Sequence, residues 1–352
     1  MKIVMLAQIG SVHTARWCAA LLRHKHDITV ISNSWKQQDI PGVRNIYLSG
    51  FSTRAYFSNI PRVKKLIKEI GPDIVHSHYA TGFGLWGSMQ SIAPLVVSVW
   101  GTDIVDAGRK KLVGLVTRRT LKKARLITAT SQYLANKTAE FCSDAKNKLE
   151  IVPFGITMPE DDEITNSPSN EAVTFIFAKI YLANYAPEMV IQAFADARDK
   201  MPPARLNMFG GGPLWDKMKR LAHNLGVDDV VNIVGSISHQ QAAKEIMRSD
   251  IMVMPSYNES FGVAAVEASA SALPVIATNV GGIPEIIKHD ETGILIEPGN
   301  CDELTAAMIR LANDADLRRK MGRAGREFVR TRFTETICLD KMEAVYQRVR
   351  QG

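Results

Sequence analysis

Short apolar segments alternate with longer amphipathic segments along the whole chain, and this alternation limits the fold more than any other feature. Several apolar segments have no polar face, as expected of strands that helices cover on both sides. The pattern predicts an α/β protein with a mostly parallel sheet in each half. The predicted strands are KIVMLA, ITVIS, NIYLS, DIVHSH, PLVVSVW, RLITATS and LEIVPF in the first half, and VTFIFAK, RLNMFG, VVNIVG, DIMVMPS, PVIATNV and GILIEP in the second.

The segment TMPEDDEITNSPSNEA (157–172) separates the two halves. It is acidic, contains two prolines and has no apolar periodicity, so we expect a linker over 157–171. Domains are predicted at 1–156 and 172–330, with a C-terminal helix at 331–352 as a candidate to pack back on the first domain. Ligands of open parallel sheets bind at the carboxyl ends of the strands, so we expect a functional cleft between the two sheets.

Composition narrows the class of protein. Hydrophobic residues make up 46% and charged residues 22%, which is typical of a soluble globular chain. The four cysteines lie far apart without a CxxC pair, which argues against a disulfide framework or a zinc site and fits a reducing cytosol. The apolar run at the start of the chain is too short for a signal peptide. The uncharged stretch 79–102 could suggest a membrane span, but glycines and Pro94 interrupt it, so we expect a helix followed by a buried strand. The net charge of +7 favours an anionic partner without choosing among nucleic acid, anionic lipid and phosphorylated metabolites.

Two acids, Glu259 and Glu267, bracket the segment ESFGVAAVE, which follows the predicted strand DIMVMPS. Glu259 is expected just before a helix and Glu267 about one turn inside it. Backbone N–H groups at 260–263, where this helix starts, can bind an anion or sugar hydroxyls, and the carboxylates can accept hydrogen bonds from a vicinal diol. The residues alone leave an equal alternative, in which Glu259 caps the helix and Glu267 is a surface acid.

ESFGVAAVE resembles the EX7E motif of retaining glycosyltransferases with the GT-B fold, and it is most similar to family 4 of that superfamily. Other segments resemble motifs of the same family, in the same order, over nearly the whole chain. These segments are QIGSVHTARW (8–17), WGTDI (100–104), VPFGI (152–156), FGGGPL (209–214), VGS (234–236), VGGIPEII (280–287) and TGILIEPGN (292–300). The resemblance implies two Rossmann-like domains whose parallel sheets face a central cleft.

The same resemblance implies a donor site. The C-terminal domain would hold a UDP- or GDP-sugar, with Glu267 on the ribose and Glu259 on the sugar or its phosphates, and with neither a metal nor a further cofactor. Transfer would retain the anomeric configuration, because the leaving diphosphate helps to deprotonate the acceptor while the protein supplies positive charge. The further donor-binding residues implied are Gly10, Gly211, Ser260, Phe261, Gly262 and Val263.

The sequence departs from the family pattern at two places. Lys179 stands where the family usually has Arg, so it offers a point charge without a bidentate fork. Tyr185 stands near the usual Lys, so it offers a hydrogen bond but no charge, and the expected cations fall from two to one. Trp100 replaces a His that usually touches the donor sugar, which leaves Asp103 to orient the donor or the acceptor.

Catalytic and acceptor-binding residues are predicted in both domains. His13 lies in the first strand-to-helix loop, where an acceptor would approach, although a lone His is more often structural. Trp100 can stack on a sugar face or pack in the core. The predicted catalytic residues are Glu259, Lys179, Asp103 and His13, and the predicted acceptor-binding residues are Ser11, His13, Arg16 and Trp100.

The stretch GRKKLVGLVTRRTLKKAR (108–125) holds eight Lys and Arg and no acid. Its apolar residues recur near helical spacing, which is typical of a basic amphipathic helix at an anionic membrane surface. The solvated face of a soluble helix explains the pattern equally well.

These features predict a retaining glycosyltransferase that moves a sugar from a nucleotide sugar to a saccharide or lipid-linked saccharide. Its product would be a cell-surface polysaccharide, a lipopolysaccharide or a glycolipid, made in the cytoplasm or at the inner face of the cell membrane. The alternatives are a nonhydrolysing sugar-nucleotide epimerase or a phosphorylase of the same fold, and a catalytically weakened partner subunit. The net charge also allows a nucleic-acid-binding protein, but the sequence has no recognition motif or aromatic–basic platform.

Overall fold

The computed structural model of the chain describes residues 1–33, 39–50, 52–161, 164 and 172–351. They form two compact units, of which one comprises Met1–Gly155 with Glu335–Gly352 and the other comprises Ile156–Thr334. Most of the predicted linker, 157–171, lies outside the described residues.

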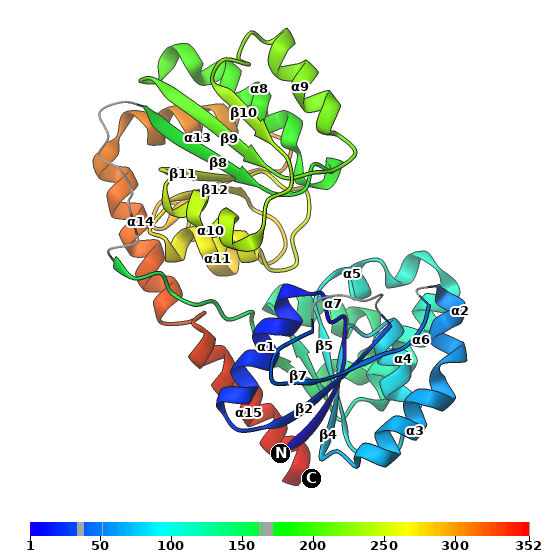
Figure 1. The fold of residues 1–352 in the computed structure, drawn as a ribbon. Helices are drawn as coiled ribbons and strands as arrows, with labels where there is room; N and C mark the ends of the chain where they lie inside the picture. The colour runs from blue at the N-terminus through cyan, green and yellow to red at the C-terminus, as the bar shows by residue number, and fades with distance from the viewer. Residues whose placement is uncertain (34–38, 51, 162–163, 165–171, 352) are drawn as a thin grey trace. The chain divides into compact units, whose positions relative to one another are not determined.

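Seven parallel strands form the sheet of the first unit, in the order β3-β2-β1-β4-β5-β6-β7 (Figure 1). Every one of them falls on a predicted strand, so the predicted parallel sheet is confirmed for this half. The strands are β1 (Lys2–Leu6), β2 (Asp27–Ser32), β3 (Arg44–Tyr47), β4 (Ile74–His78), β5 (Leu95–Val99), β6 (Leu126–Ala129) and β7 (Leu149–Ile151).

Alternate strand residues build an apolar layer on each face of this sheet. Val4 and Val75 belong to the layer that α3, α4, α6 and α7 cover, while Ile3 and Ile74 belong to the layer under α1 and α15. Helix α15 follows the second unit in the chain and packs on α1 and β4 of the first. The helices are α1 (Val12–Arg23), α2 (Thr53–Ser58), α3 (Ile60–Ile70), α4 (Gly82–Ser88), α5 (Thr102–Val105), α6 (Lys111–Lys123), α7 (Gln132–Phe141) and α15 (Glu335–Gln351), with 3-10 turns at Ala107–Arg109 and Ser143–Lys148.

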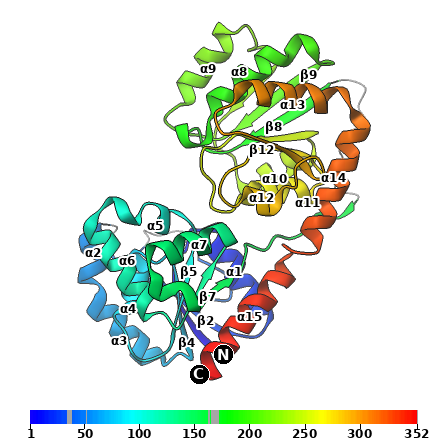
Figure 2. The same cartoon turned by 180° about the vertical axis from the view of Figure 1, so that it is seen from behind.

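Six parallel strands form the sheet of the second unit, in the order β10-β9-β8-β11-β12-β13, which confirms the prediction for the second half. Phe175 and Phe177 of β8 face the apolar layer beneath α8, α9 and α13. Helices α10 and α11 lie on the other side of the sheet, where α14 packs against α11 (Figure 2). The strands are β8 (Val173–Ala178), β9 (Ala204–Phe209), β10 (Val231–Val234), β11 (Ile251–Met254), β12 (Val275–Thr278) and β13 (Gly293–Ile296). The helices are α8 (Pro187–Ala197), α9 (Trp215–Asn224), α10 (His239–Met247), α11 (Val263–Ala270), α12 (Ile283–Ile286), α13 (Cys301–Asn313) and α14 (Ala315–Arg330), with 3-10 turns at Ala183–Tyr185 and Arg198–Lys200.

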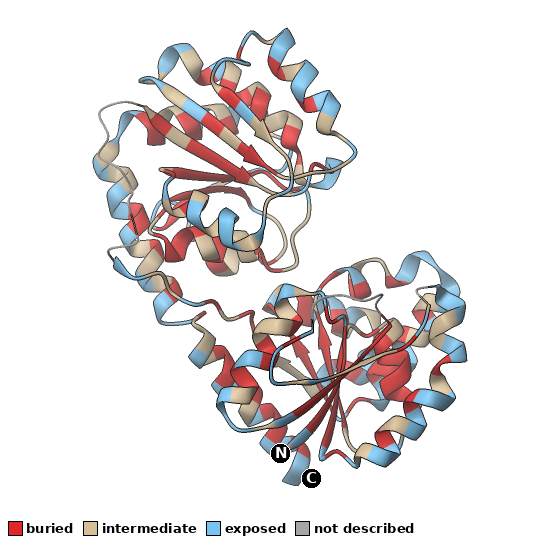
Figure 3. Ribbon diagram, viewed as in Figure 1, coloured by how far each residue is buried: buried red, intermediate tan, exposed pale blue. Residues whose placement is uncertain are grey.

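The central strands of each sheet are buried, whereas the strands β3, β7 and β10 at the sheet edges are partly exposed (Figure 3). Because all strands of one sheet run in the same direction, their carboxyl ends share one edge, where loops can bring polar side chains together. Within the described ranges, no helix combines the length and the hydropathy that a membrane span requires.

Candidate functional site

Lys179 and Glu259 meet at the carboxyl edge of the second sheet. Lys179 follows β8 directly, and Glu259 lies in the loop between β11 and α11. The strands β8 and β11 are neighbours in the sheet. The Lys179 ammonium forms an ion pair with Glu259 Oε1, and the two side chains are only 17% and 11% exposed. Ser256 Oγ lies 3.5 Å from the same carboxylate oxygen. A cation and an acid are therefore held together in a sheltered place, where their interaction is screened less than at the surface.

An aromatic ring lies beside this ion pair. Tyr185 ends a short 3-10 turn before α8, and the Lys179 ammonium lies 5.0 Å from the centroid of its ring. At that distance the negative face of the ring attracts the ammonium. The Tyr185 ring thus helps to hold the Lys179 ammonium in place.

The loop 259–262 is fixed by its backbone. Glu259 O accepts a hydrogen bond of 3.0 Å from the Gly282 N–H, and a Cβ added to Gly281 (φ +57°) would lie 1.7 Å from that oxygen. Gly262 caps α11 at φ +100°, a conformation that side chains disfavour. The Phe261 ring is buried against Phe333, with the ring centroids 5.6 Å apart. A ligand at this loop could therefore meet only the backbone of Phe261.

Glu267 lies on α11 next to a histidine that the sequence analysis did not single out. His239 Nε2 lies 3.5 Å from Glu267 Oε1, and the Glu267 side chain is 18% exposed. His239 is the first residue of α10, whose start is fixed by a capping box of Ser238 and Gln241. The motif Ser-x-x-Gln marks this helix start in the sequence, but the approach of α10 to α11 is a tertiary contact that it cannot show.

The glycine run after β9 lies against the loop that carries Lys179. A Cβ on Gly210 would be 2.1 Å from Lys179 O, and the Tyr181 N–H donates a 2.8 Å hydrogen bond to Gly211 O. The absence of side chains therefore lets the two loops pack together. Gly211, predicted to bind the donor, lies beside the Lys179 segment.

In the first unit, the predicted residues His13 and Trp100 belong to an aromatic cluster. The His13 ring stacks on Phe154 with centroids 4.1 Å apart, and Trp100 meets His13 edge-on at 5.8 Å. Trp100 also contacts the buried His78, at 4.4 Å between centroids. Desolvation holds the pKa of His78 well below its ordinary value, so this ring is neutral.

Asp103 is buried beneath this cluster and bonded to backbone. The residue is 3% exposed, and its carboxylate accepts hydrogen bonds from the N–H groups of Ala80 (2.8 Å), Trp100 (3.1 Å) and Gly101 (3.0 Å). Burial raises the pKa of this carboxyl, and the backbone hydrogen bonds oppose the shift. The carboxylate thus holds the loop after β5, including Gly101 at φ +137° and the Trp100 backbone.

The other predicted residues of the first unit lie around the start of α1. Gly10 is exposed in the loop after β1, and Ser11 is the N-cap residue of α1. Arg16 and His13 line a cavity of about 20 Å³ with Phe154, which is room for one water rather than a sugar. The predicted residues thus gather in two groups, one in each unit. Over the described ranges, no group of three or more His, Cys, Asp or Glu side chains could hold a metal ion.

Two protein-family models match the chain. The model described as "Glycosyl transferases group 1" matches residues 158–328, and the model described as "Glycosyl transferase 4-like" matches residues 2–131. N-acetyl-alpha-D-glucosaminyl L-malate synthase of Bacillus anthracis is 30% identical over 293 residues, which cover 79% of this chain and 75% of the relative. A GDP-mannose-dependent alpha-(1-6)-phosphatidylinositol monomannoside mannosyltransferase of Mycobacterium tuberculosis is 28% identical over 294 residues, covering 76% and 74%.

Solved structures resemble the whole chain. Sucrose-phosphate synthase from Thermosynechococcus elongatus is similar with a TM-score of 0.84, at 21% identity and 99% coverage of both chains. HepE from Anabaena, solved with UDP and glucose, has a TM-score of 0.81 at 18% identity and covers 99% of this chain and 100% of its own. The predicted GT-B fold is confirmed by these similarities.

Proposed function

Because the chain belongs to the glycosyl transferase group 1 family, we propose that it moves a sugar from a nucleotide sugar to a saccharide or lipid-linked saccharide, with retention of anomeric configuration. The pairing of Lys179 with Glu259 carries this proposal. A cation beside an acid and a helix start offers groups complementary to a diphosphate and to sugar hydroxyls. Relatives named for the synthesis of glycolipids and related glycosides support the class of reaction.

In the proposed reaction, the diphosphate of a UDP- or GDP-sugar binds at Lys179, and Glu259 accepts hydrogen bonds from sugar hydroxyls. The bond between the anomeric carbon and the diphosphate breaks, and Lys179 stabilises the charge that develops on the leaving group. A diphosphate oxygen takes the proton of the acceptor hydroxyl, which forms the new glycosidic bond on the same face of the sugar. Glu267 holds the ribose hydroxyls, and the N–H groups of 260–263 face the donor.

The first unit is proposed to supply the acceptor side, through Ser11, His13, Arg16 and Trp100. Trp100 offers a ring for stacking on a sugar, since it is only partly buried among His13, His78 and Phe154. For Asp103 we propose a positioning role, because its carboxylate already accepts three backbone N–H groups. Gly10, exposed in the loop after β1, is instead proposed to bind the donor.

A thermal-shift screen with UDP, GDP, ADP and their sugars tests the donor. A ligand at about 100 times its Kd that binds only the folded chain stabilises it by about 2.7 kcal/mol, which raises the Tm. We expect one nucleotide family to give such a shift in wild type and a reduced shift in Glu267→Ala, with Glu291→Ala as the control on an exposed acid. If no nucleotide shifts a folded sample, a catalytically weakened partner subunit becomes the better explanation.

We also propose that α6 touches an anionic membrane. Leu112 and Leu115 are 57% and 66% exposed on this helix, and Arg118 and Arg119 line a shallow groove with Leu115. Exposed apolar residues among cations are typical of helices that lie in a membrane surface. Leu112→Ser/Leu115→Ser should release the protein from sedimenting vesicles of phosphatidylcholine and phosphatidylglycerol, while Phe57→Ser, an exposed apolar residue of α2, should not. Equal sedimentation of all three proteins would leave α6 as an ordinary solvated helix.

A further inference from the structure

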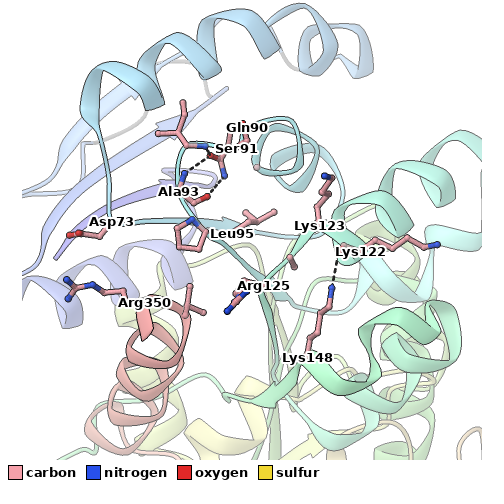
Figure 4. Close-up of a pocket in the computed structure, with 15 residues that line it drawn as sticks. Asp73, Gln90, Ser91, Ala93, Leu95, Lys122, Lys123, Arg125, Lys148 and Arg350 are labelled. Carbon is pink, nitrogen blue, oxygen red and sulfur yellow. Dashed lines mark hydrogen bonds between the residues drawn. The ribbon is translucent and has the colours of Figure 1, made fainter. Parts of the chain in front are cut away.

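A hollow of about 1020 Å³ opens at the amino edge of the first sheet (Figure 4). Asp73 precedes β4, Leu95 begins β5, Arg125 precedes β6 and Lys148 precedes β7, and all four residues line it. The predicted residues of this unit instead follow the carboxyl ends of β1 and β5, for example Trp100. Because the strands are parallel, the hollow lies at the opposite edge of the sheet from that group.

The lining of the hollow is strongly basic. Five basic side chains face a single carboxylate, Asp73, and they come from α6, α15 and the starts of β6 and β7. We call this place the basic hollow; its cations are Lys122, Lys123, Arg125, Lys148 and Arg350. Elements far apart in the sequence thus bring like charges together, which is unfavourable unless an anion compensates them.

Two of the five cations already interact with other groups of the protein. Lys122 pairs with Asp144 at 3.1 Å, and the Lys148 ammonium donates a 2.8 Å hydrogen bond to Lys122 O. Lys123, Arg125 and Arg350 have no ion pair among the residues that the structure describes. In the view of Figure 4, Arg125 lies between Arg350 and Lys123. The lone acid, Asp73, accepts the Lys2 backbone N–H at 2.7 Å.

Helix ends explain only part of this charge. Lys123 is in the last turn of α6 and Arg350 in the last turn of α15, where cations favour the carboxyl end of the helix dipole. Arg125 lies between α6 and β6, outside either element. Its guanidinium offers a planar fork of donors, the group best suited to phosphate oxygens.

We propose that the basic hollow binds a phosphate-bearing ligand with at least two negative charges, at a site separate from the donor site. Lys123, Arg125 and Arg350 bind the phosphate oxygens, and the Ser91 hydroxyl, which also lines the hollow, adds a neutral donor. The volume is at the upper end of the range of small-molecule pockets, about 300–1,000 Å³, so it admits a phosphorylated metabolite or a lipid headgroup.

Calorimetric titration of inorganic pyrophosphate into the full chain at low salt tests this site. Lys123→Gln/Arg125→Gln should raise the Kd at least about tenfold, because both residues supply charge-assisted hydrogen bonds. Lys179→Ala should retain the binding, which separates the hollow from the donor site. Lys110→Gln/Lys111→Gln, which removes two exposed charges at the other end of α6, should also retain it.

Two results would overturn the proposal. One is an equal loss in Lys110→Gln/Lys111→Gln, which would show a diffuse response to net charge. The other is a loss of binding in Lys179→Ala alone, which would place the pyrophosphate at the donor site. All substituted basic residues of the hollow and of the α6 control are exposed, so their Tm should match wild type.

Vesicles then distinguish the two sources of phosphate. If the ligand is a lipid headgroup, Lys123→Gln/Arg125→Gln also loses retention on vesicles of phosphatidylcholine and phosphatidic acid. If the ligand is a free phosphorylated metabolite, this variant sediments with the same vesicles as wild type does, while its pyrophosphate binding is lost. Both results require the loss of pyrophosphate binding in the hollow variant.

Discussion

Glu259→Ala is expected to lower kcat for sugar transfer by at least about 100-fold, because it removes the carboxylate that positions the donor sugar through its hydroxyls in the proposed reaction. It also leaves the Lys179 ammonium, 17% exposed, without the carboxylate that holds it. The burial of this ion pair is intermediate between that of a surface pair and that of a fully buried pair. We therefore expect the free energy of unfolding to fall by about 1–3 kcal/mol, which leaves the chain folded. Full activity in this variant would show that Glu259 has no role in the proposed transfer.

A double-mutant cycle makes this test specific. Lys179→Ala should cause a similar loss, and Lys179→Ala/Glu259→Ala should be little worse than either single variant, because the two groups act as a unit. Glu327→Ala breaks an exposed pair with Arg330 on α14 and serves as the control, with unchanged kcat expected. Fully additive losses would mean that Lys179 and Glu259 act independently.

The proposed donor site has one predicted cation, Lys179, so we expect its pair with Glu259 to matter more than a charge at the surface. With Tyr185 at the position of the usual second cation, Lys179 is held between an acid and a ring. The ring attracts the ammonium without competing with phosphate oxygens for its N–H donors, as a carboxylate does. Tyr185 therefore helps to hold the Lys179 ammonium in place but adds no charge of its own.

The fold was predictable from the sequence because its signals are local. A buried parallel strand needs an apolar run and a covering helix needs an amphipathic one, and both patterns are continuous in the chain. The pair of Lys179 and Glu259 has no such signal. It exists because β8 pairs with β11, with Phe175 opposite Ile251, which places loops about 80 residues apart side by side.

Other parts of the site depend on burial, which a single sequence does not show. The WGTDI segment predicts that Asp103 orients the donor or the acceptor, but it does not show that this residue is only 3% exposed and that its carboxylate is bonded to backbone. His239 gave no signal of its own, because its approach to Glu267 depends on how α10 packs beside α11. The motifs thus predict which type of side chain stands at a position, but not how deeply it is buried or which groups it contacts.

Gly322→Ala is expected to destabilise the second unit by about 2–4 kcal/mol, because α14 packs too closely on α11 to admit a side chain. A Cβ at Gly322 would lie 1.9 Å from Ala272 O. That oxygen belongs to the turn after α11, where Ala272 has φ +58° and the Leu273 N–H bonds back to Ala268 O. Since the obstructing atom is backbone, α14 must shift away from the helix that carries Glu267.

Gly325→Ala on the same helix is the matched control. A Cβ there would meet Ser269 Cβ at 3.4 Å, an ordinary contact, so the gain in helix propensity of about 1 kcal/mol should appear as a neutral or raised Tm. Thermal unfolding of both variants in the full chain measures the difference, and nucleotide binding should weaken only in Gly322→Ala. If both variants unfold at the wild-type temperature, α14 and α11 do not approach as closely as the structure places them, and the position of Glu267 no longer depends on this contact.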